Sequence, residues 1–95
     1  MKLLYFRAGW CGVCHVKEPV AEEVARALGL PLEVFDVDEA HGRAEAGVRR
    51  IRGVPTLALV DGDRVRFRLM GSTITPENVE HLVARMRPPP GAPPP

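Results

Sequence analysis

The pattern of hydrophobic and polar positions along the chain predicts four β-strands. Residues 2–7 form an apolar run without clean alternation, which is typical of a strand buried on both faces. Residues 32–37 are rich in β-branched and aromatic side chains and therefore favour a second strand. The runs 57–60 and 65–70 flank an Asp-Gly pair at 61–62, which is typical of a β-hairpin. Because apolar residues alternate with arginines in the second of these runs, we expect it to be a half-exposed edge strand.

Three further segments show the spacing of amphipathic helices. They are residues 11–28, residues 40–50 and the stretch that begins at Pro76. Gly29 is well placed to end the first helix, and Thr75 is well placed to cap the third. The side chains expected to face the core are Val16, Val20, Val24, Ala27 and Leu28 in the first helix, Ala44, Val48 and Ile51 in the second, and Val79, Leu82, Val83 and Met86 in the third.

The order strand, helix, strand, helix, strand, strand, helix predicts an α/β fold with a mixed four-stranded sheet and three helices. The helix between the first two strands implies a right-handed parallel crossover. A chain of 95 residues has room for one domain, which we assign to residues 1–87. Residues 88–95 contain six of the ten prolines, and this composition predicts an extended or disordered tail.

The composition argues against several classes of partner. Thirteen basic and twelve acidic residues give a net charge of +1, which offers no electrostatic argument for nucleic acid or an anionic membrane. Arginines cluster at 49–52 and 64–68, and we interpret both clusters as solvated rims rather than binding patches. The apolar run before Arg7 is too short for a signal-peptide core, and no segment is apolar enough to span a membrane. We expect a monomer that works in the cytoplasm.

The residues that carry chemistry are concentrated in the segment Gly-Trp-Cys-Gly-Val-Cys-His at positions 9–15. Cys11 and Cys14 are the only cysteines, and their spacing at the start of a helix places them on one face within disulfide reach. Unpaired N–H groups and the macrodipole at a helix N-terminus favour a thiolate. We assign Cys11 as the nucleophile that attacks a target disulfide, and Cys14 as the residue that resolves the mixed disulfide.

Several motifs together resemble the thioredoxin family. Residues 10–14 are similar to its active-site motif Trp-Cys-Gly-Pro-Cys, and Pro19 falls where the first long helix of that family carries a proline. Residues 52–56 resemble the cis-proline loop of the family, and the hairpin and the Gly71 turn follow in the same order. The resemblance extends to about Arg87. It implies a minimal thioredoxin fold that lacks the family's N-terminal strand and helix.

The resemblance implies a thiol–disulfide oxidoreductase that acts on protein disulfides, more as a reductant than as an oxidant, without a cofactor. Its partners would be disulfide-containing client proteins and an upstream disulfide reductase. Pro55 would be cis beside the dithiol, and the backbone of Val54 would pair with an extended client segment. The residues that match the family's apolar docking surface are Trp10, Val37, Gly53, Val54 and Gly71. Val37 and Val54 can also be ordinary core residues.

Four positions depart from the family pattern. Thioredoxins pair a buried aspartate on one strand with a lysine on the next, and these positions here are Tyr5 and Val34. Val13 replaces the motif proline, and His15 replaces the usual lysine. A protonated His15 can favour a thiolate electrostatically, or the residue can be a solvated helix position. Without the usual carboxylate to deprotonate Cys14, the redox potential cannot be read from the sequence.

Three alternatives to the oxidoreductase hypothesis remain open. The fold can serve as a redox-sensing or protein-binding module without client turnover. Cys11, Cys14 and His15 also spell the attachment motif of a c-type haem. Zinc can be held by the two cysteines with two of the three histidines His15, His41 and His81.

Overall fold

The sheet is built around β1 (Lys2–Arg7), whose four inner residues are buried. The computed structural model describes residues 1–86, in which the strand order is β2-β1-β3-β4. β1 pairs in parallel with β2 (Leu32–Asp36) and in antiparallel with β3 (Thr56–Asp61). β3 pairs in antiparallel with the edge strand β4 (Arg64–Met70). The sheet is therefore mixed, as predicted.

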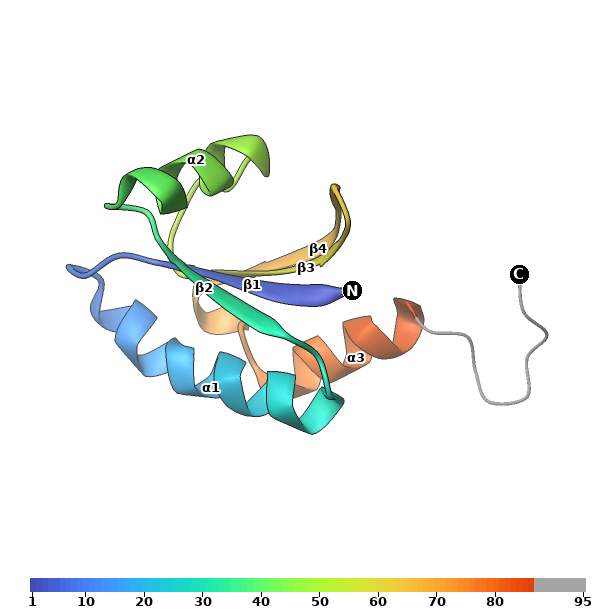
Figure 1. Cartoon of the computed structure of the whole chain (residues 1–95). Helices are drawn as coiled ribbons and strands as arrows, with labels where there is room; N and C mark the ends of the chain where they lie inside the picture. Colours follow the sequence, from blue (N-terminus) through green and yellow to red (C-terminus); the bar gives the residue numbers. More distant parts are fainter. Residues whose placement is uncertain (87–95) are drawn as a thin grey trace.

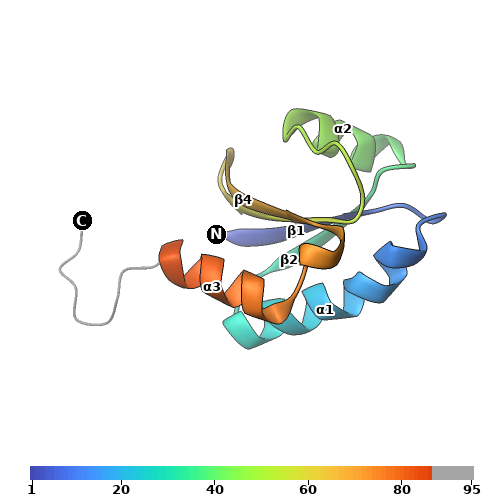
Figure 2. The same cartoon turned by 180° about the vertical axis from the view of Figure 1, so that it is seen from behind.

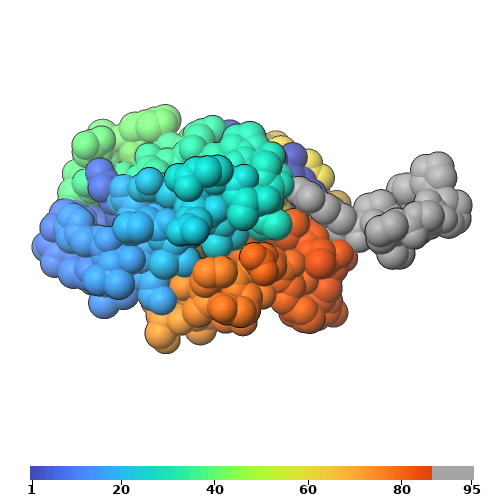
Figure 3. All heavy atoms as spheres, turned by 90° about the horizontal axis from the view of Figure 1, so that it is seen from below, coloured from blue at the N-terminus to red at the C-terminus, as the bar shows by residue number. Residues whose placement is uncertain are grey.

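The helices lie on both faces of this sheet. α1 (Gly12–Leu28) and α3 (Pro76–Met86) cover one face, and α2 (Ala40–Val48) covers the other (Figures 1 and 2). The short 3-10 helix η1 (Gly71–Thr73) leads into α3. Figure 3 shows α1 and α3 side by side over their face of the sheet. The element order confirms the predicted α/β fold with three helices.

Predicted helix ends are confirmed at two positions. Gly29 adopts a left-handed conformation with φ of 67° and ends α1. The hydroxyl of Thr75 accepts a hydrogen bond of 3.1 Å from the backbone N–H of Asn78 and so caps α3. Arg87 and the predicted tail at 88–95 lie outside the described residues, so the domain boundary stays a prediction.

Alternate residues of β1 supply two core layers. Leu3 and Tyr5 pack on the side of α1 and α3, whereas Leu4 and Phe6 pack on the side of α2. This division follows from the pleat of a strand, which sends successive side chains to opposite faces. The apolar run at 2–7 therefore has the buried central position that its lack of alternation predicts.

The buried face of α1 agrees with the prediction at Val24, which is buried, and at Val20 and Leu28, which pack against the core, but differs elsewhere. Val16 is 68% exposed and Ala27 is exposed, whereas Cys14, Ala21 and Ala25 are buried. Residues seven and eleven positions after Cys14 share its face of a helix. Cys14, Ala21 and Ala25 therefore share the buried face with Val24, whereas Val16 faces outward.

The buried face of α2 also differs from the prediction, although Ile51 after the helix packs against the core as expected. Ala44 is exposed and Val48 is 79% exposed, whereas Gly42 and Ala46 are buried. A Cβ atom on Gly42 would lie 1.9 Å from the backbone oxygen of Asp36. The helix therefore approaches the end of β2 so closely at Gly42 that only glycine fits.

A β-bulge changes the predicted alternation of β4. The register passes from Leu59 opposite Phe67 to Val60 opposite Val65, which leaves Arg66 as the extra residue. Phe67 therefore packs on the side of α1 and α3, whereas Val65 packs on the side of α2. The prediction that both side chains share one face is wrong.

The hairpin loop lies one residue later than predicted. β3 ends at Asp61 and β4 begins at Arg64, so the two loop residues are Gly62 and Asp63. Gly62 has φ of 59°, which a glycine adopts without steric cost. This conformation suits the first position of a two-residue hairpin loop.

Candidate redox site

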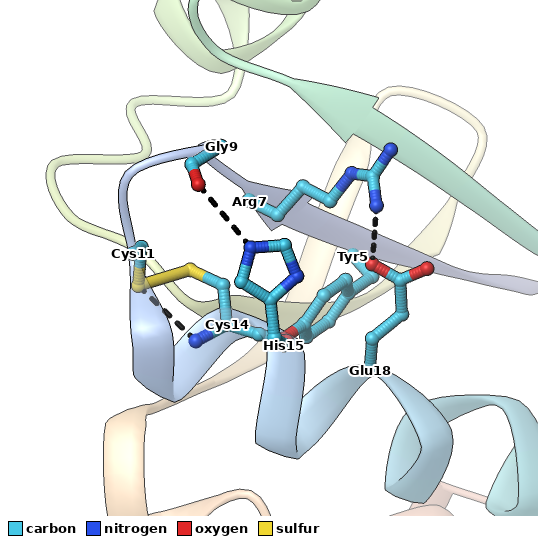
Figure 4. Close-up of polar contacts among 7 residues, drawn as sticks. All are labelled: Tyr5, Arg7, Gly9, Cys11, Cys14, His15 and Glu18. Carbon is cyan, nitrogen blue, oxygen red and sulfur yellow. Dashed lines mark hydrogen bonds and ion pairs between the residues drawn. A yellow bond between two sulfur atoms is a disulfide. The ribbon is translucent and has the colours of Figure 1, made fainter.

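Cys11 and Cys14 form a disulfide at the N-terminus of α1, with their Cα atoms 5.2 Å apart (Figure 4). Cys11 is the N-cap residue, and its sulfur accepts a hydrogen bond of 3.1 Å from the backbone N–H of Cys14. Cys11 is 7% exposed, whereas Cys14 is 0% exposed. Solvent, and therefore another disulfide, reaches Cys11 first.

The N-cap position gives Cys11 an environment that stabilises negative charge. Its sulfur accepts from one of the helix N–H groups that have no partner within the helix, and the helix dipole places partial positive charge at this end. The first turn of α1 contains no acidic residue that would oppose this effect. In the reduced protein the same features would stabilise negative charge on the Cys11 sulfur.

Tyr5 is fully buried behind the disulfide, and its hydroxyl donates a hydrogen bond of 2.6 Å to the backbone oxygen of Cys14 (Figure 4). Burial raises the pKa of Tyr5 to about 12; the negative charge of Glu18 adds to this increase, and the positive charge of Arg7 opposes it. The phenol is therefore neutral where thiols titrate. It acts as a hydrogen-bond donor to the backbone, not as a base for the sulfur.

Two polar contacts join the active-site helix to the preceding strand and loop. Arg7 pairs with Glu18 at 2.8 Å and connects the end of β1 to α1 (Figure 4). The exposed ring of His15 lies with Nε2 at 3.2 Å from the backbone oxygen of Gly9. A carbonyl oxygen only accepts, so Nε2 carries the hydrogen in this bond. This hydrogen bond from His15 therefore links α1 to the loop that precedes Cys11.

The loop at residues 52–56 lies against the disulfide. The peptide bond between Val54 and Pro55 is cis. The hydroxyl of Thr56 donates a hydrogen bond of 2.6 Å to the backbone oxygen of Gly53. The backbone N–H of Gly71 donates a hydrogen bond of 3.1 Å to the backbone oxygen of Pro55. These contacts hold the loop and the Gly71 turn together, although the two are separated in sequence.

The structure brings most of the predicted docking residues together. Val37 and Val54 are partly buried and pack both against the cluster that contains the two cysteines and against the core on the side of α2, so they border the disulfide and are also core residues. Trp10 is 74% exposed and, with Gly53, lines a groove of about 420 Å³ that also includes the two valines. Gly71 does not line this groove and reaches the site only through its bond to the loop.

Sequence reasoning missed three contributors to the site. Ala8 is fully buried against the two cysteines. Arg7 and Glu18 form the ion pair described above. Arg7 at the end of an otherwise apolar strand was a signal for an ion-pair partner, but that partner, Glu18, lies eleven positions away on the following helix, where local sequence patterns do not identify it.

The residues suggested for zinc are not brought together. His41 lies against the ring of Phe35, with ring centroids 5.5 Å apart, and His81 is exposed on α3. Within residues 1–86, no three histidine, cysteine or acidic side chains are grouped so that they could hold a metal ion. None of the helices in that part of the chain has the length and apolar character needed to cross a membrane.

Comparison with known proteins agrees with this geometry. The family model for thioredoxin matches residues 1–86. A thioredoxin-like protein of Synechocystis is 29% identical over 80 residues, which cover 84% of this chain and 73% of the relative. Thioredoxin of Bacillus subtilis is 36% identical over 61 residues, which cover 63% of this chain and 59% of the relative. The chain thus spans somewhat less than two thirds of the bacterial thioredoxin.

The fold has close structural neighbours as well. Thioredoxin 1 of Thermosipho africanus aligns with a TM-score of 0.78 at 24% identity, over 90% of this chain and 93% of the other. The chain therefore belongs to the thioredoxin family and is a thiol–disulfide oxidoreductase. Membership implies disulfide-containing substrates and a reductase partner in general terms.

Proposed function

We propose that this protein reduces disulfide bonds of client proteins through the dithiol of Cys11 and Cys14. The Cys11 thiolate attacks one client sulfur, forms a mixed disulfide and releases the other client sulfur as a thiolate, which takes up a proton. The Cys14 thiolate then attacks the sulfur of Cys11 and releases the second client sulfur. Two electrons pass to the client, and the protein is left with the Cys11–Cys14 disulfide.

The observation that carries this assignment is the unequal environment of the two sulfurs. Cys11 combines the accessible position with the helix N-terminus, which suits a nucleophile. Cys14 has no accessible surface and lies within disulfide distance of Cys11, so it reaches only a sulfur that is already attached there. Cys11 therefore attacks the client disulfide at the surface, and Cys14 then attacks the sulfur of Cys11 from the protein interior and releases the client.

The surface beside the disulfide supports binding of an extended client segment. Val54 precedes β3, takes no part in its pairing with either neighbour, and has no hydrogen-bond partner for its backbone groups within residues 1–86. Those groups are therefore available to pair with a client backbone, as an added strand would. Trp10 and Val37 supply apolar contact area next to them.

A reductant must return two electrons to the oxidised form. The resemblance to thioredoxins favours a disulfide reductase in this role, and the cycle belongs to a reducing compartment such as the cytoplasm. There, cysteines of small proteins are kept as thiols between turnovers. Packing of Val54 against the cluster that contains both cysteines keeps the loop next to the disulfide, where it can meet the client backbone.

Insulin reduction with dithiothreitol as the electron source tests the proposal. The full chain should accelerate the reaction over dithiothreitol alone, Cys11→Ser should abolish the acceleration, and Cys14→Ser should accumulate mixed disulfides through Cys11. Equal rates for the protein and both variants would sink the enzymatic hypothesis and favour the redox-sensing module. Visible absorption of the purified chain separates out the haem hypothesis, since covalent haem would give a Soret band that survives acid-acetone extraction.

The equilibrium potential of the dithiol against glutathione tests the direction of transfer. A potential of about −270 mV is expected of a reductant, whereas a potential of about −120 mV is typical of an oxidant. A potential close to the second value would leave the oxidoreductase activity intact and reverse the proposed direction.

A further inference from the structure

Two grooves flank the segment of residues 51–52 that leads into the cis-proline loop. The first is the groove beside the disulfide, which includes Trp10 and Val54. The second, of about 290 Å³, lies toward the end of β4 and includes Thr56 and Met70. Residues 51 and 52 line both grooves, so the two adjoin there. The charged side chains that line them are all arginines: Arg43, Arg50, Arg52 and Arg68.

The positive charge of these four arginines is not compensated locally. No carboxylate lines either groove, and none of the four forms an ion pair within residues 1–86. Arg43 and Arg68 donate to neutral backbone oxygens at 3.2 and 3.0 Å. Arg50 and Arg52 have no side-chain hydrogen bond in the described part of the chain. The net charge of +1 therefore conceals two grooves whose charged lining is entirely positive.

We propose that these grooves bind an acidic, extended segment of the client protein that adjoins the client disulfide. This inference rests on the proposed function and defines its substrate class. The free backbone groups of Val54 favour an extended polypeptide over a small ligand. Trp10 and Ile51 contact the apolar side chains of the segment, and the guanidinium groups pair with its aspartates and glutamates.

This inference revises the interpretation of the arginine clusters. Alternation along a strand treats Arg66 and Arg68 alike, but the bulge separates them. Arg66 lies 3.9 Å from Asp61 and bonds to the sulfur of Met86, whereas Arg68 lines the second groove. Complementary charge on two partners mainly raises their association rate and fades as salt increases. The preference for acidic clients should therefore appear in the association rate constant of the protein with its client.

Three model peptides of equal length test the inference. Each carries one disulfide, flanked by glutamates, serines or lysines. The second-order rate constant for the pre-reduced full chain is measured by acid quench and chromatography. We expect the glutamate peptide to react fastest and the lysine peptide slowest, with the difference shrinking at high salt.

Two variants of equal charge change locate the effect. Arg50→Gln/Arg52→Gln removes two groove charges without breaking a side-chain contact, and should reduce the advantage of the glutamate peptide over the serine peptide about fivefold to tenfold. Arg26→Gln/Arg85→Gln removes two exposed charges on α1 and α3, and should leave that advantage unchanged. An equal loss in both variants would assign the preference to net charge and overturn the inference.

The remaining outcomes separate this inference from the proposed function. Equal rates with all three peptides would overturn the inference while leaving client reduction intact. If the protein reduces none of them, the proposed function fails and the inference fails with it. Glutathione disulfide supplies carboxylates without a long chain. If the groove variant loses activity only toward that substrate, the ligand is a small acidic disulfide and the polypeptide proposal is wrong.

Discussion

Tyr5 stands where the resemblance to thioredoxins implies an aspartate, and its surroundings keep it neutral. It is the only tyrosine, so its phenolate absorbance can be titrated without interference. We expect a midpoint of about 12 in the folded protein, instead of the ordinary 10.0, because burial raises its pKa. In denaturant the midpoint should return to about 10. A folded midpoint at the ordinary value would show that the ring is accessible to solvent.

The raised pKa of Tyr5 also sets a pH dependence of stability. The folded protein keeps the phenol protonated more strongly than the unfolded chain does, so its contribution is complete below pH 10. That contribution is lost as the pH rises through the folded pKa of about 12. Tyr5→Phe should therefore be less sensitive to pH in this window. Denaturant titrations of both proteins between those pH values measure the difference.

The same substitution tests what the hydroxyl does at neutral pH. Because it bonds to the backbone oxygen of Cys14 and not to a sulfur, Tyr5→Phe should cost about 1 kcal/mol in the free energy of unfolding. The pH profile for alkylation of Cys11 should stay the same, measured in a Cys14→Ser background so that one thiol reacts. A shift of the profile by a full pH unit or more would give Tyr5 a direct role in thiol chemistry.

At the level of whole elements, the approach of α2 to β2 depends on Gly42, and a second glycine of the same helix, Gly47, has the opposite expected effect. Gly42→Ala places a Cβ against the backbone oxygen of Asp36 and should destabilise the fold by about 1–3 kcal/mol or more. Gly47→Ala is the matched control, since its Cβ meets nothing within 4 Å and alanine favours the helix by about 0.5–1 kcal/mol. Urea unfolding of both variants measures the two effects. Equal stabilities would mean that α2 does not make this close approach.

Elements whose signals are local were predictable, and those that depend on close packing were not. The hairpin, the Gly29 end of α1 and the Thr75 cap each follow from residues a few positions apart. The close approach of α2 to β2 at Gly42 is instead a contact with another element, which hydrophobic periodicity does not record. The β4 bulge likewise depends on pairing with β3. The alternation of apolar residues and arginines along β4 therefore does not place Val65 and Phe67 on the same face.

The candidate site divides in the same way. The CxxC spacing and the helix that follows made the dithiol predictable from one short segment. The family resemblance added the loop before Thr56 as a neighbour of that dithiol. The arginine-lined grooves were not predictable, because Arg43 and Arg68 come together only when α2 and β4 are placed about one loop. The net charge of the sequence sums these arginines with acidic residues elsewhere on the protein, so it does not reveal the positive grooves.

At the scale of the whole molecule, the core clusters that the structure describes are built from residues within 1–86, and the sequence at 88–95 contains only proline, glycine and alanine. A chain that ends at Arg87 should therefore unfold at the same urea concentration as the full chain and reduce insulin at the same rate. The shorter chain retains the residues that pack around the two cysteines, which are Ala8, Val37 and Val54. A lower unfolding midpoint would place the boundary of the domain beyond residue 87. An unchanged midpoint with slower insulin reduction would instead assign the tail to client binding.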